Sequence, residues 1–378
     1  IQDGNYGADY PKADEFVASG IPFLTSKVIG GIGTINPDKF DYIKEEKHQS
    51  LKKAQIVAGD ILFTNRGANV GTIAIVPDYI ATANIGPQLT LVRCNDCILK
   101  EYLFQFLRGS FFQKQIQQRD SGSAMNFFGI KDTERFKVLV PSLSEQKRIA
   151  QILSTWDKAI SVTEKLLANS QQQKKALMQQ LLTGKKRLLD ENGVRFNGKW
   201  EKKLLSDVAD VYQPKTISQS MMSDSGYPVY GANGVIGFYQ EFNHETEQIA
   251  VTCRGSTCGI VNWTQAKSWI TGNAMVINTD NYSYVSKKFL FYTLNGSDLK
   301  YLISGSGQPQ ITGNIKTHII NLPCIEEQQK IATVLSAADA EIYTLEKKLA
   351  CLRDEKKALM QQLLTGKRRV KVDEAVAE

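Results

Sequence analysis

The chain has 378 residues, 42% of them hydrophobic and 22% charged, with a formal net charge of +7 and a pI near 8.9. This length leaves room for two or three domains, and the composition is ordinary for a globular protein. The sequence has no run of about 18 apolar residues, so no membrane span is predicted. It does not start with a charged and then an apolar segment, so no secretory signal is predicted either. The moderate positive charge is compatible with a polyanionic partner but does not identify one.

The spacing of the six cysteines does not predict a metal-binding site. Cys94 and Cys97 have zinc-knuckle spacing, but the nearest candidate pair, Cys253 and Cys258, lies about 155 residues away with a wider gap. The three histidines do not complete a ligand set by their spacing. We therefore expect ordinary reduced cysteines and no metal site.

Residues 1–140 are predicted to form a strand-rich α+β domain. Apolar and β-branched runs bounded by Gly and Asp indicate strands at 21–24, 56–64, 73–76 and 89–92. Apolar residues at helical spacing from Leu103 to Phe112 predict one amphipathic helix over 101–118.

Residues 141–188 predict a long helix, because they are rich in Ala, Leu, Glu, Gln and Lys. Ser144 can cap its start, and Gly184 suits a left-handed residue after its end. About 38 residues between them would span roughly 57 Å.

Residues 189–322 are predicted to form a second strand-rich domain, with strands at 204–211, 227–230, 248–252 and 274–277 and a helix beginning near 287. Residues 323–370 then predict a second long helix, and residues 371–378 a charged tail that frays.

The two long helices are copies of one unit. With an offset of 182 positions they align without a gap, and residues 174–185 recur letter for letter as 356–367. Both copies carry a heptad seam, which predicts a coiled coil. The seam residues are Ile149, Leu153, Trp156, Ile160, Leu167, Leu177, Leu181, Ile331, Leu335, Ile342, Leu345, Leu349, Leu352, Leu359 and Leu363.

Lys174 and Lys356 interrupt the same seam row in both copies. A polar residue in a seam can fix the register or leave a surface for another protein. The two strand-rich domains also resemble each other faintly: residues 64–71 align with 252–259, 82–84 with 271–273, and 121–123 with 304–306. The chain therefore predicts an internal duplication with a pseudo-two-fold arrangement, in which two domains are separated by an antiparallel coiled coil.

Such an arrangement would hold two domains apart on a stiff spacer. Because one turn of double-stranded DNA measures about 34 Å, the two domains could read two half-sites on one duplex. Domains of different sequence would then read different half-sites.

The motifs together resemble the specificity subunits of type I restriction–modification systems. The resemblance rests on Glu145-Gln146 followed by Ile149-Ala150, Asp157 and the 181–184 helix end, all repeated in the second copy. Residues 230–237 and 305–309 resemble the target recognition domains of that family, as do residues 59–63 and 66–67. The resemblance covers essentially the whole chain.

The resemblance implies a non-catalytic, DNA-reading subunit in the bacterial or archaeal cytoplasm. Each recognition domain would read one half of a split target, while the helices hold two modification (methyltransferase) subunits that restriction (motor–nuclease) subunits then join. S-adenosylmethionine, ATP and Mg²⁺ would belong to those partners. The first domain lacks an equivalent of Trp200 and residues 204–209, so we expect its opening strand to be missing from this sequence.

Polar and basic residues in Gly-rich turns are the candidate DNA contacts. Arg66 and Arg254 occupy matched Arg-Gly turns, and since both domains keep them, we interpret them as phosphate or scaffold contacts rather than base readers. The Ser, Asn and Gln residues could read adenine or belong to solvated loops. The full set is Arg66, Arg254, Asn65, Asn69, Lys27, Ser121, Ser123, Asn126, Lys131, Lys215, Asn233, Ser256, Thr257, Ser304, Ser306, Gln308, Gln310 and Lys316.

Two other functions remain open. The chain could be a coiled-coil scaffold whose domains bind proteins, or an autonomous nuclease. The second would need an active site, and no phosphate-loop, methyltransferase or nuclease motif is present in the sequence. DNA binding would weaken steeply with ionic strength, which separates it from a protein-binding role.

Overall fold

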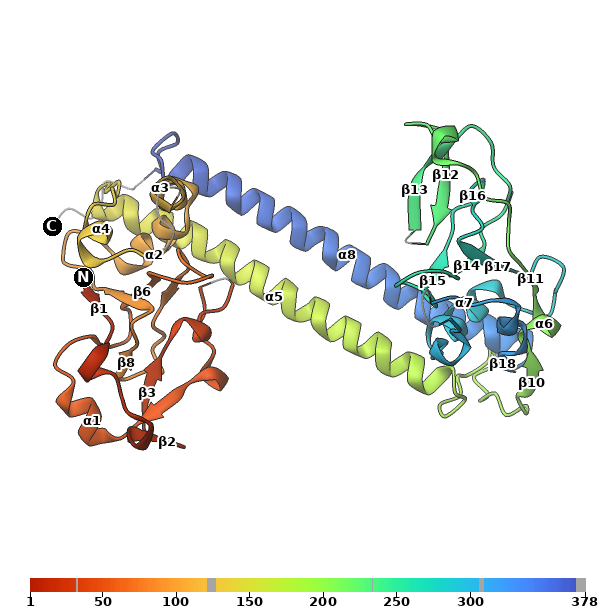
Figure 1. Cartoon of the computed structure of the whole chain (residues 1–378), viewed down its shortest axis with the longest axis horizontal. Helices are drawn as coiled ribbons and strands as arrows, with labels where there is room; N and C mark the ends of the chain where they lie inside the picture. Colours follow the sequence, from red (N-terminus) through yellow and green to blue (C-terminus); the bar gives the residue numbers. More distant parts are fainter. Residues whose placement is uncertain (32, 121–126, 233, 306–308, 372–378) are drawn as a thin grey trace. The chain divides into compact units, whose positions relative to one another are not determined.

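The computed structural model describes residues 1–31, 33–120, 127–232, 234–305 and 309–371. The chain folds into two compact units, unit 1 comprising Ile1–Glu164 with Lys347–Glu378, and unit 2 comprising Lys165–Glu346. Two helices of 39 residues, α5 (Leu143–Leu181) and α8 (Ile325–Leu363), each contribute one part to each unit (Figure 1). Each compact unit therefore contains parts of both long helices, whereas the segments predicted from the sequence keep each helix whole. The predicted segment boundaries stay a prediction.

The described residues of unit 1 form two sheets. The first is entirely antiparallel and the second has one parallel pair, β3 with β8. The first sheet has the order β1 (Gln2–Asp3), β9 (Leu89–Val92), β6 (Ile61–Thr64), β7 (Ile73–Ile75). The second has the order β2 (Phe16–Val17), β4 (Asp41–Ile43), β3 (Ile21–Leu24), β8 (Ala83–Ile85), β5 (Gln55–Ile56). Its shorter helices are α1 (Glu45–Ser50), α2 (Lys100–Arg108), α3 (Ser110–Asp120) and α4 (Ile130–Glu134).

Unit 2 repeats this plan. Its antiparallel sheet has the order β11 (Asp210–Tyr212), β17 (Ala274–Asn278), β14 (Ile249–Thr252), β15 (Val261–Trp263). A second sheet has the order β13 (Gly234–Tyr239), β12 (Tyr227–Gly231), β16 (Trp269–Ile270), with β12 and β16 parallel. A further pair joins β10 (Glu201–Leu204) to β18 (Ile319–Leu322), and the short helices are α6 (Leu205–Val208) and α7 (Lys287–Asn295).

The matched strand orders confirm the internal repeat and correct one detail of it. Thr64 pairs with Leu89 in unit 1, and Thr252 pairs with Ala274 in unit 2. Leu89 and Ala274 are therefore equivalent, with an offset of 185. The predicted alignment of 82–84 with 271–273 is wrong by four residues, because only the strand pairing, not the short Thr-x-Asn match, fixes the register.

Two predicted elements are also corrected. The single helix expected over 101–118 is broken at Gly109, whose extended backbone ends α2 before α3 begins. A Cβ at Gly109 would lie 3.0 Å from Leu364 Cδ1, so the end of α8 packs closely there. The strand expected over 204–211 is interrupted by α6, because Asp207 caps the amide of Leu204 at 3.0 Å.

The long helices end as the sequence predicts but α5 begins two residues earlier. Leu143 is its first residue, so Ser142 rather than Ser144 takes the capping position and accepts from the amide of Glu145 at 3.4 Å. Gly184 has a φ of 71° after α5, and Gly366 has a φ of 72° after α8. A left-handed residue at this place lets the chain turn back over the last carbonyls of the helix.

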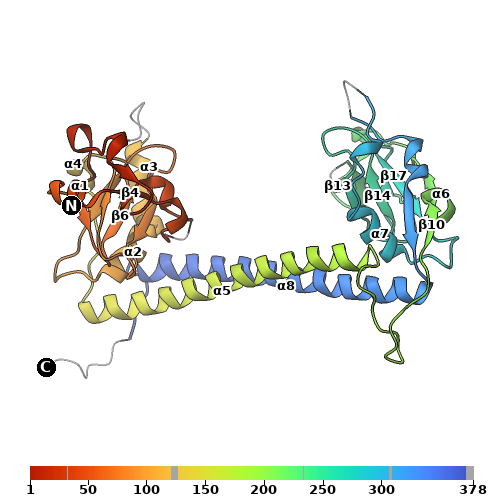
Figure 2. The same ribbon diagram turned by 90° about the horizontal axis from the view of Figure 1, so that it is seen from below.

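In each unit, α5 and α8 run antiparallel and are joined by reciprocal ion pairs. Lys356 Nζ lies 2.6 Å from Asp157 Oδ1 in unit 1, and Lys174 Nζ lies 2.5 Å from Asp339 Oδ1 in unit 2. Lys356 and Asp339 are the copies of Lys174 and Asp157, offset by 182. The two lysines that interrupt the seam are therefore matched to carboxylates of the other helix, which explains their place in an otherwise apolar row. Figures 1 and 2 show the two helices side by side.

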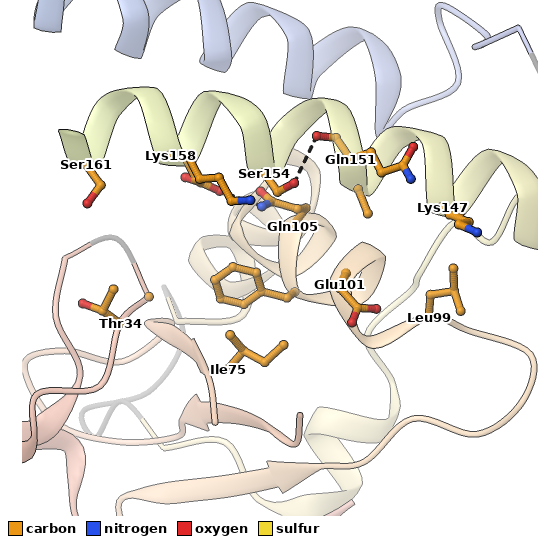
Figure 3. Close-up of a pocket in the computed structure, with 14 residues that line it drawn as sticks. Thr34, Ile75, Leu99, Glu101, Gln105, Lys147, Gln151, Ser154, Lys158 and Ser161 are labelled. Carbon is orange, nitrogen blue, oxygen red and sulfur yellow. Dashed lines mark hydrogen bonds between the residues drawn. The ribbon is translucent and has the colours of Figure 1, made fainter. Parts of the chain in front are cut away.

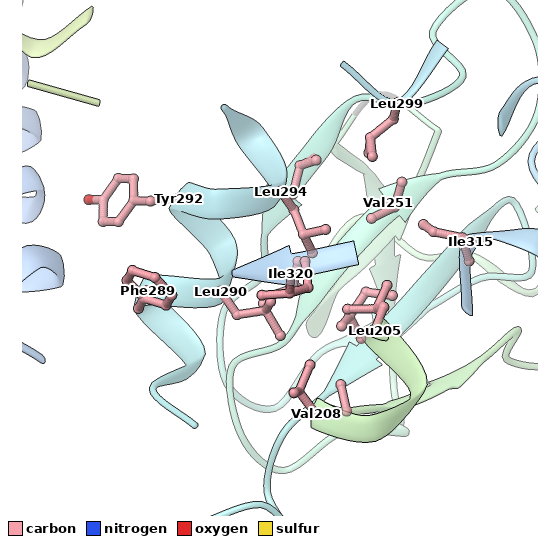
Figure 4. Close-up of a cluster of buried hydrophobic side chains, with 14 of the residues drawn as sticks. Leu205, Val208, Val251, Phe289, Leu290, Tyr292, Leu294, Leu299, Ile315 and Ile320 are labelled. Atoms are coloured by element: carbon pink, nitrogen blue, oxygen red, sulfur yellow. The ribbon is translucent and has the colours of Figure 1, made fainter. Parts of the chain in front are cut away.

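Every predicted seam residue is buried or partly buried. The seam does more than join two helices, because its ends enter the domain cores. Ile149 and Leu153 pack in one cluster with Phe106 of α2 and Leu363 of α8. In unit 2, Leu181 and Leu335 join the cluster built around Phe289 and other residues of the second domain, part of which Figure 4 shows.

The Asp157–Lys356 pair is nearly buried, with side-chain exposures of 22% and 7%. Burial by itself would raise the pKa of Asp157, but Arg108, Lys356 and Gln105 together outweigh it and lower that pKa. Burial and the neighbouring Arg108 lower the pKa of Lys356. A carboxylate with a lowered pKa stabilises the fold above its unfolded pKa of about 4 and loses that contribution as the pH falls through the folded value.

Replacing Asp157 by Ala should destabilise unit 1 by about 3 kcal/mol, because it leaves the Lys356 ammonium buried without its partner. Chemical denaturation followed by circular dichroism measures this. Asp157→Leu combined with Lys356→Met should recover most of the loss. Arg353→Ala is the control, since its pair with Glu164 is exposed and such pairs contribute about 0–1 kcal/mol. An equal loss in both single variants would contradict the assignment.

Candidate nucleic-acid interface

The matched Arg-Gly turns have the same backbone in both units. In unit 1 the amide of Gly71 donates to Thr64 O at 2.9 Å, and in unit 2 the amide of Gly259 donates to Thr252 O at 2.8 Å. Gly67 and Gly255 have φ values of 87° and 82°, and Gly71 and Gly259 have 88° and 92°. Glycine accepts this left-handed backbone without a steric cost. The sequence alignment of 64–71 with 252–259 is therefore confirmed, and Arg66 and Arg254 occupy the same structural position.

Arg66 is held in place inside unit 1. Its Nε donates to Asn65 Oδ1 at 3.1 Å, and its guanidinium lies 4.2 Å from the ring centroid of Phe127. Asn65 is fully buried and its Nδ2 donates to Thr90 Oγ1 at 2.9 Å. In this conformation Asn65 positions Arg66 and does not reach the surface.

Arg254 is exposed, and its guanidinium forms no hydrogen bond or ion pair with the described part of the chain. Cys253 takes the position of Asn65 and cannot orient the arginine in the same way. Several other predicted residues converge here. The backbone of Gln310 bridges both Arg254 and Ser304, so Ser304 and Gln310 lie beside the turn. Thr257 Oγ1 donates to Ala232 O at 3.4 Å, which brings Ala232, just after β12, to the same place.

Asn69 and Ser256 are exposed within the two matched turns, beside the arginines. Lys131, Lys215 and Lys316 lie outside the turns and are also exposed. Lys27 is paired with Asp41 at 2.7 Å, so its ammonium already has an anionic partner. Six predicted residues lie outside the described part of the chain: Ser121, Ser123, Asn126, Asn233, Ser306 and Gln308.

Phe127 is a neighbour of Arg66 that the sequence analysis missed. It is 46% exposed, and its backbone bridges that of Arg66 as Gln310 bridges Arg254. No local sequence signal shows that Phe127 corresponds to Gln310. The two arginines are 188 positions apart and the two bridging residues 183, so a single ungapped alignment does not match both pairs. Only the strand pairing reveals that they are equivalent.

The repeated Glu-Gln motif at the start of each long helix fastens that helix to a domain. Gln146 is buried; its Oε1 accepts from the amide of Leu99 at 2.8 Å, just before α2. Gln328 accepts from the amide of Ser286 at 2.8 Å, just before α7. The sequence identified these glutamines as part of a motif, and the structure gives their role.

The preceding glutamates bind an arginine beyond the end of the other helix. Glu145 Oε2 accepts from Arg369 at 2.6 Å, and Glu327 Oε1 accepts from Arg187 at 2.5 Å. Hydrogen bonds from Arg369 lower the pKa of Glu145 despite the burial of its side chain. In unit 2 Trp200 also donates to Glu327, at 3.2 Å. These bonds extend the antiparallel register of the seam to the helix ends.

Two equivalent grooves lie beside the exactly repeated helix segment. In unit 1 a groove of about 310 Å³ is lined by Lys357, Met360 and Gln361 with Gly109 and others. In unit 2 a groove of about 700 Å³ is lined by the copies of these residues, Lys175, Met178, Gln179 and Gly296, with others. The identical helix residues thus form one wall of both grooves, and the domain helix ends form the other.

A third pocket, of about 890 Å³, lies in unit 1 between α2 and α5 (Figure 3). Its lining includes Gln151, Ser154 and Lys158 of α5 and Glu101 of α2, with Gln105 of α2 lying against α5, where it donates to Asp157 at 2.6 Å.

The corresponding positions of unit 2 are filled differently. Trp263 stands where unit 1 has Ile75, and Lys288 stands where it has Glu101. Lys288 Nζ lies 3.8 Å from the Trp263 ring centroid. This surface therefore differs between the two units, whereas the grooves beside the repeated segment share their helix wall.

Two further features are absent from the described residues. No cluster of three or more His, Cys, Asp or Glu side chains there could hold a metal ion. No helix in that part of the chain is long and apolar enough to cross a membrane.

Comparison with known proteins agrees with this geometry. A family model described as the type I restriction modification DNA specificity domain matches residues 8–169 and again residues 197–351. A specificity subunit assigned to the MjaX type I restriction enzyme of Methanocaldococcus jannaschii is 28% identical, over 90% of this chain and 87% of its own length. The MjaVIII specificity subunit of the same organism is 26% identical, over 85% of this chain and 81% of its own length. The crystal structure of a type I restriction–modification S subunit from M. genitalium covers 96% of this chain and 92% of its own, with a TM-score of 0.64 and 15% identity, and so shares the fold.

Replacing Arg254 by Ala should weaken DNA binding by a similar factor on every sequence and reduce the slope of log K against log salt by about 1, because one phosphate contact is lost. Arg66→Ala should do the same. Fluorescence anisotropy over a salt series measures both, with the exposed Lys199→Ala as the control. A changed base preference at one target position with an unchanged salt slope would instead assign Arg254 to base reading.

Proposed function

Because this chain belongs to the family of type I restriction–modification DNA specificity subunits, we propose that each of its two domains reads one half of a split DNA target. The chain is the DNA-recognition component of such a system and not its catalytic one. The observation that carries the proposal is the pair of matched Arg turns. They keep one backbone and one arginine while the residues around them differ, as expected for two readers with a common scaffold and different targets.

The specificity subunit of a type I system assembles with DNA and with other subunits of that system. For this chain we propose two modification subunits, one at each of the grooves lined by the 174–185 and 356–367 repeats. Lys175, Gln179 and Gln180 are exposed, and so are their copies Lys357, Gln361 and Gln362. Packing within the chain does not require the exposed side chains of the two repeats to be identical. Binding of the same partner at both repeats does require it. Restriction subunits would then join this assembly.

The chemistry of methylation and cleavage would reside in those partners. We assign S-adenosylmethionine, ATP and Mg²⁺ to the modification and restriction subunits, in the bacterial or archaeal cytoplasm where the target DNA lies. The role of this chain is to position the partners on a chosen sequence.

Methylation mapping of DNA treated with the chain and its modification subunits tests the proposed function. We expect methylated sites that share two short half-sites of different sequence at a constant separation. The scaffold alternative, in which the domains bind proteins, predicts no sequence-dependent methylation and no sequence-dependent shift of duplex DNA at low salt. Cleavage of DNA by this chain alone with Mg²⁺ would indicate a nuclease.

Charge reversal tests the docking grooves. Lys175→Glu or Lys357→Glu should each leave a complex with one modification subunit in place of two, and the double variant should bind none, because each groove gains a negative charge in place of an exposed lysine of the repeated segment. Native mass spectrometry counts the subunits. Lys52→Glu, an exposed lysine outside both grooves, is the control. Two subunits bound to the double variant would show that the partners dock elsewhere.

A further inference from the structure

The position beside the shared arginine is occupied by a different side chain in each domain. Arg66 bridges Phe127 through the backbone, and Arg254 bridges Gln310. The residues that follow confirm the correspondence. The amide of Phe128 donates to Asn65 O at 2.8 Å, and the amide of Ile311 donates to Cys253 O at 3.0 Å. Phe127 and Gln310 therefore stand at one place in the fold.

The backbone of this place is paired in both domains, and in unit 2 the side chain that it carries takes no part in that pairing. Both backbone bonds of Gln310 to Ser304 are made, at 2.9 and 3.0 Å. The Gln310 side chain is exposed and forms no hydrogen bond with the described residues. Its amide keeps two donors and an acceptor for a ligand.

Phe127 presents a different chemistry at the same place. Its ring is 46% exposed and lies under the guanidinium of Arg66, 4.2 Å away. A single exposed phenylalanine needs no explanation by itself. Here, however, Asn65 holds the arginine over the ring, so that a cation and an apolar surface are presented together.

We propose that Phe127 and Gln310 are equivalent specificity-determining residues, one for each half-site. Gln310 would read adenine, whose N6 and N7 atoms match a glutamine amide. Phe127 would contact the methyl group of thymine, which offers an apolar surface in the major groove. The neighbouring arginine would bind the phosphate backbone in both domains and so place this residue against the base edges. This inference rests on the proposed function and adds a position at which the two half-sites are distinguished.

Exchange of the two side chains tests the proposal. The variants Phe127→Gln and Gln310→Phe are prepared in the complex with modification subunits, and methylated sites are mapped over a genome-scale DNA library. Phe127→Gln should change the base preference at one position of one half-site by roughly ten- to a hundred-fold and leave the other half-site and the separation unchanged. Gln310→Phe should do the same in the other half-site. Phe127→Leu, which keeps an apolar side chain, should retain the original preference.

Each outcome decides the inference. Half-sites that are unchanged in folded, active Phe127→Gln and Gln310→Phe complexes would overturn it while leaving the proposed function intact. A wild-type complex that shows no split target would overturn the proposed function itself. If Phe127→Gln fails to fold, as judged by its thermal unfolding, Gln310→Ala decides the question, because an exposed glutamine can be shortened without loss of packing. Its site should then lose the adenine preference, and an unchanged preference would refute the assignment.

Discussion

The pair formed by Asp157 and Lys356, with its copy formed by Asp339 and Lys174, is the interaction on which the rest of the structure depends. A partly buried ion pair adds little net stability, because both charges must leave water. Its value lies in register, since a one-turn slip of the antiparallel helices would leave a lysine in the apolar seam without a partner. The glutamate–arginine pairs at the helix ends impose the same register. Each long helix thus carries one aspartate and one lysine of these pairs, and each of the two binds its counterpart on the other helix.

The same aspartates connect the helices to the domains. Gln105 of α2 donates to Asp157 Oδ2, and Tyr292 of α7 donates to Asp339 Oδ2, both at 2.6 Å. A buried glutamine fixes the start of each of these domain helices to the neighbouring long helix. Each domain is therefore fixed to a long helix at both ends of one of its own helices, α2 or α7. A glutamine of the long helix binds the backbone amide before that helix, and an aspartate of the long helix binds a side chain near its last turn. A subunit that positions partners on DNA requires such rigid connections, because a loose domain would lose the geometry of its target.

The surfaces of the two units differ in a way that follows function. The two grooves share their helix wall, which fits the proposed docking of two identical partners. The turns keep an arginine and a backbone, which fits the proposed phosphate contacts. Phe127 and Gln310 differ, as do Ile75 and Trp263 beside the third pocket. This is the pattern that the proposed function predicts, with identical residues at the two proposed docking surfaces and different residues at the proposed base-reading positions.

The sequence by itself determined the duplication, the heptad seam, the glycines that end both helices and the matched Arg turns. These features are local or periodic, so that spacing alone reveals them. It placed strands well where β-branched runs were bounded by turns, and failed at Gly109 and at α6, where packing and a cap overrode the apolar pattern.

The tertiary structure decided which residues meet. Asp157 and Lys356 are 199 positions apart, and nothing in their spacing shows that they pair across antiparallel helices. Residues 82–84 were misaligned because a short motif match carries less information than a hydrogen-bonded strand register. Phe127 entered the candidate site only because strand pairing, which depends on the whole domain being folded, brings it beside Arg66.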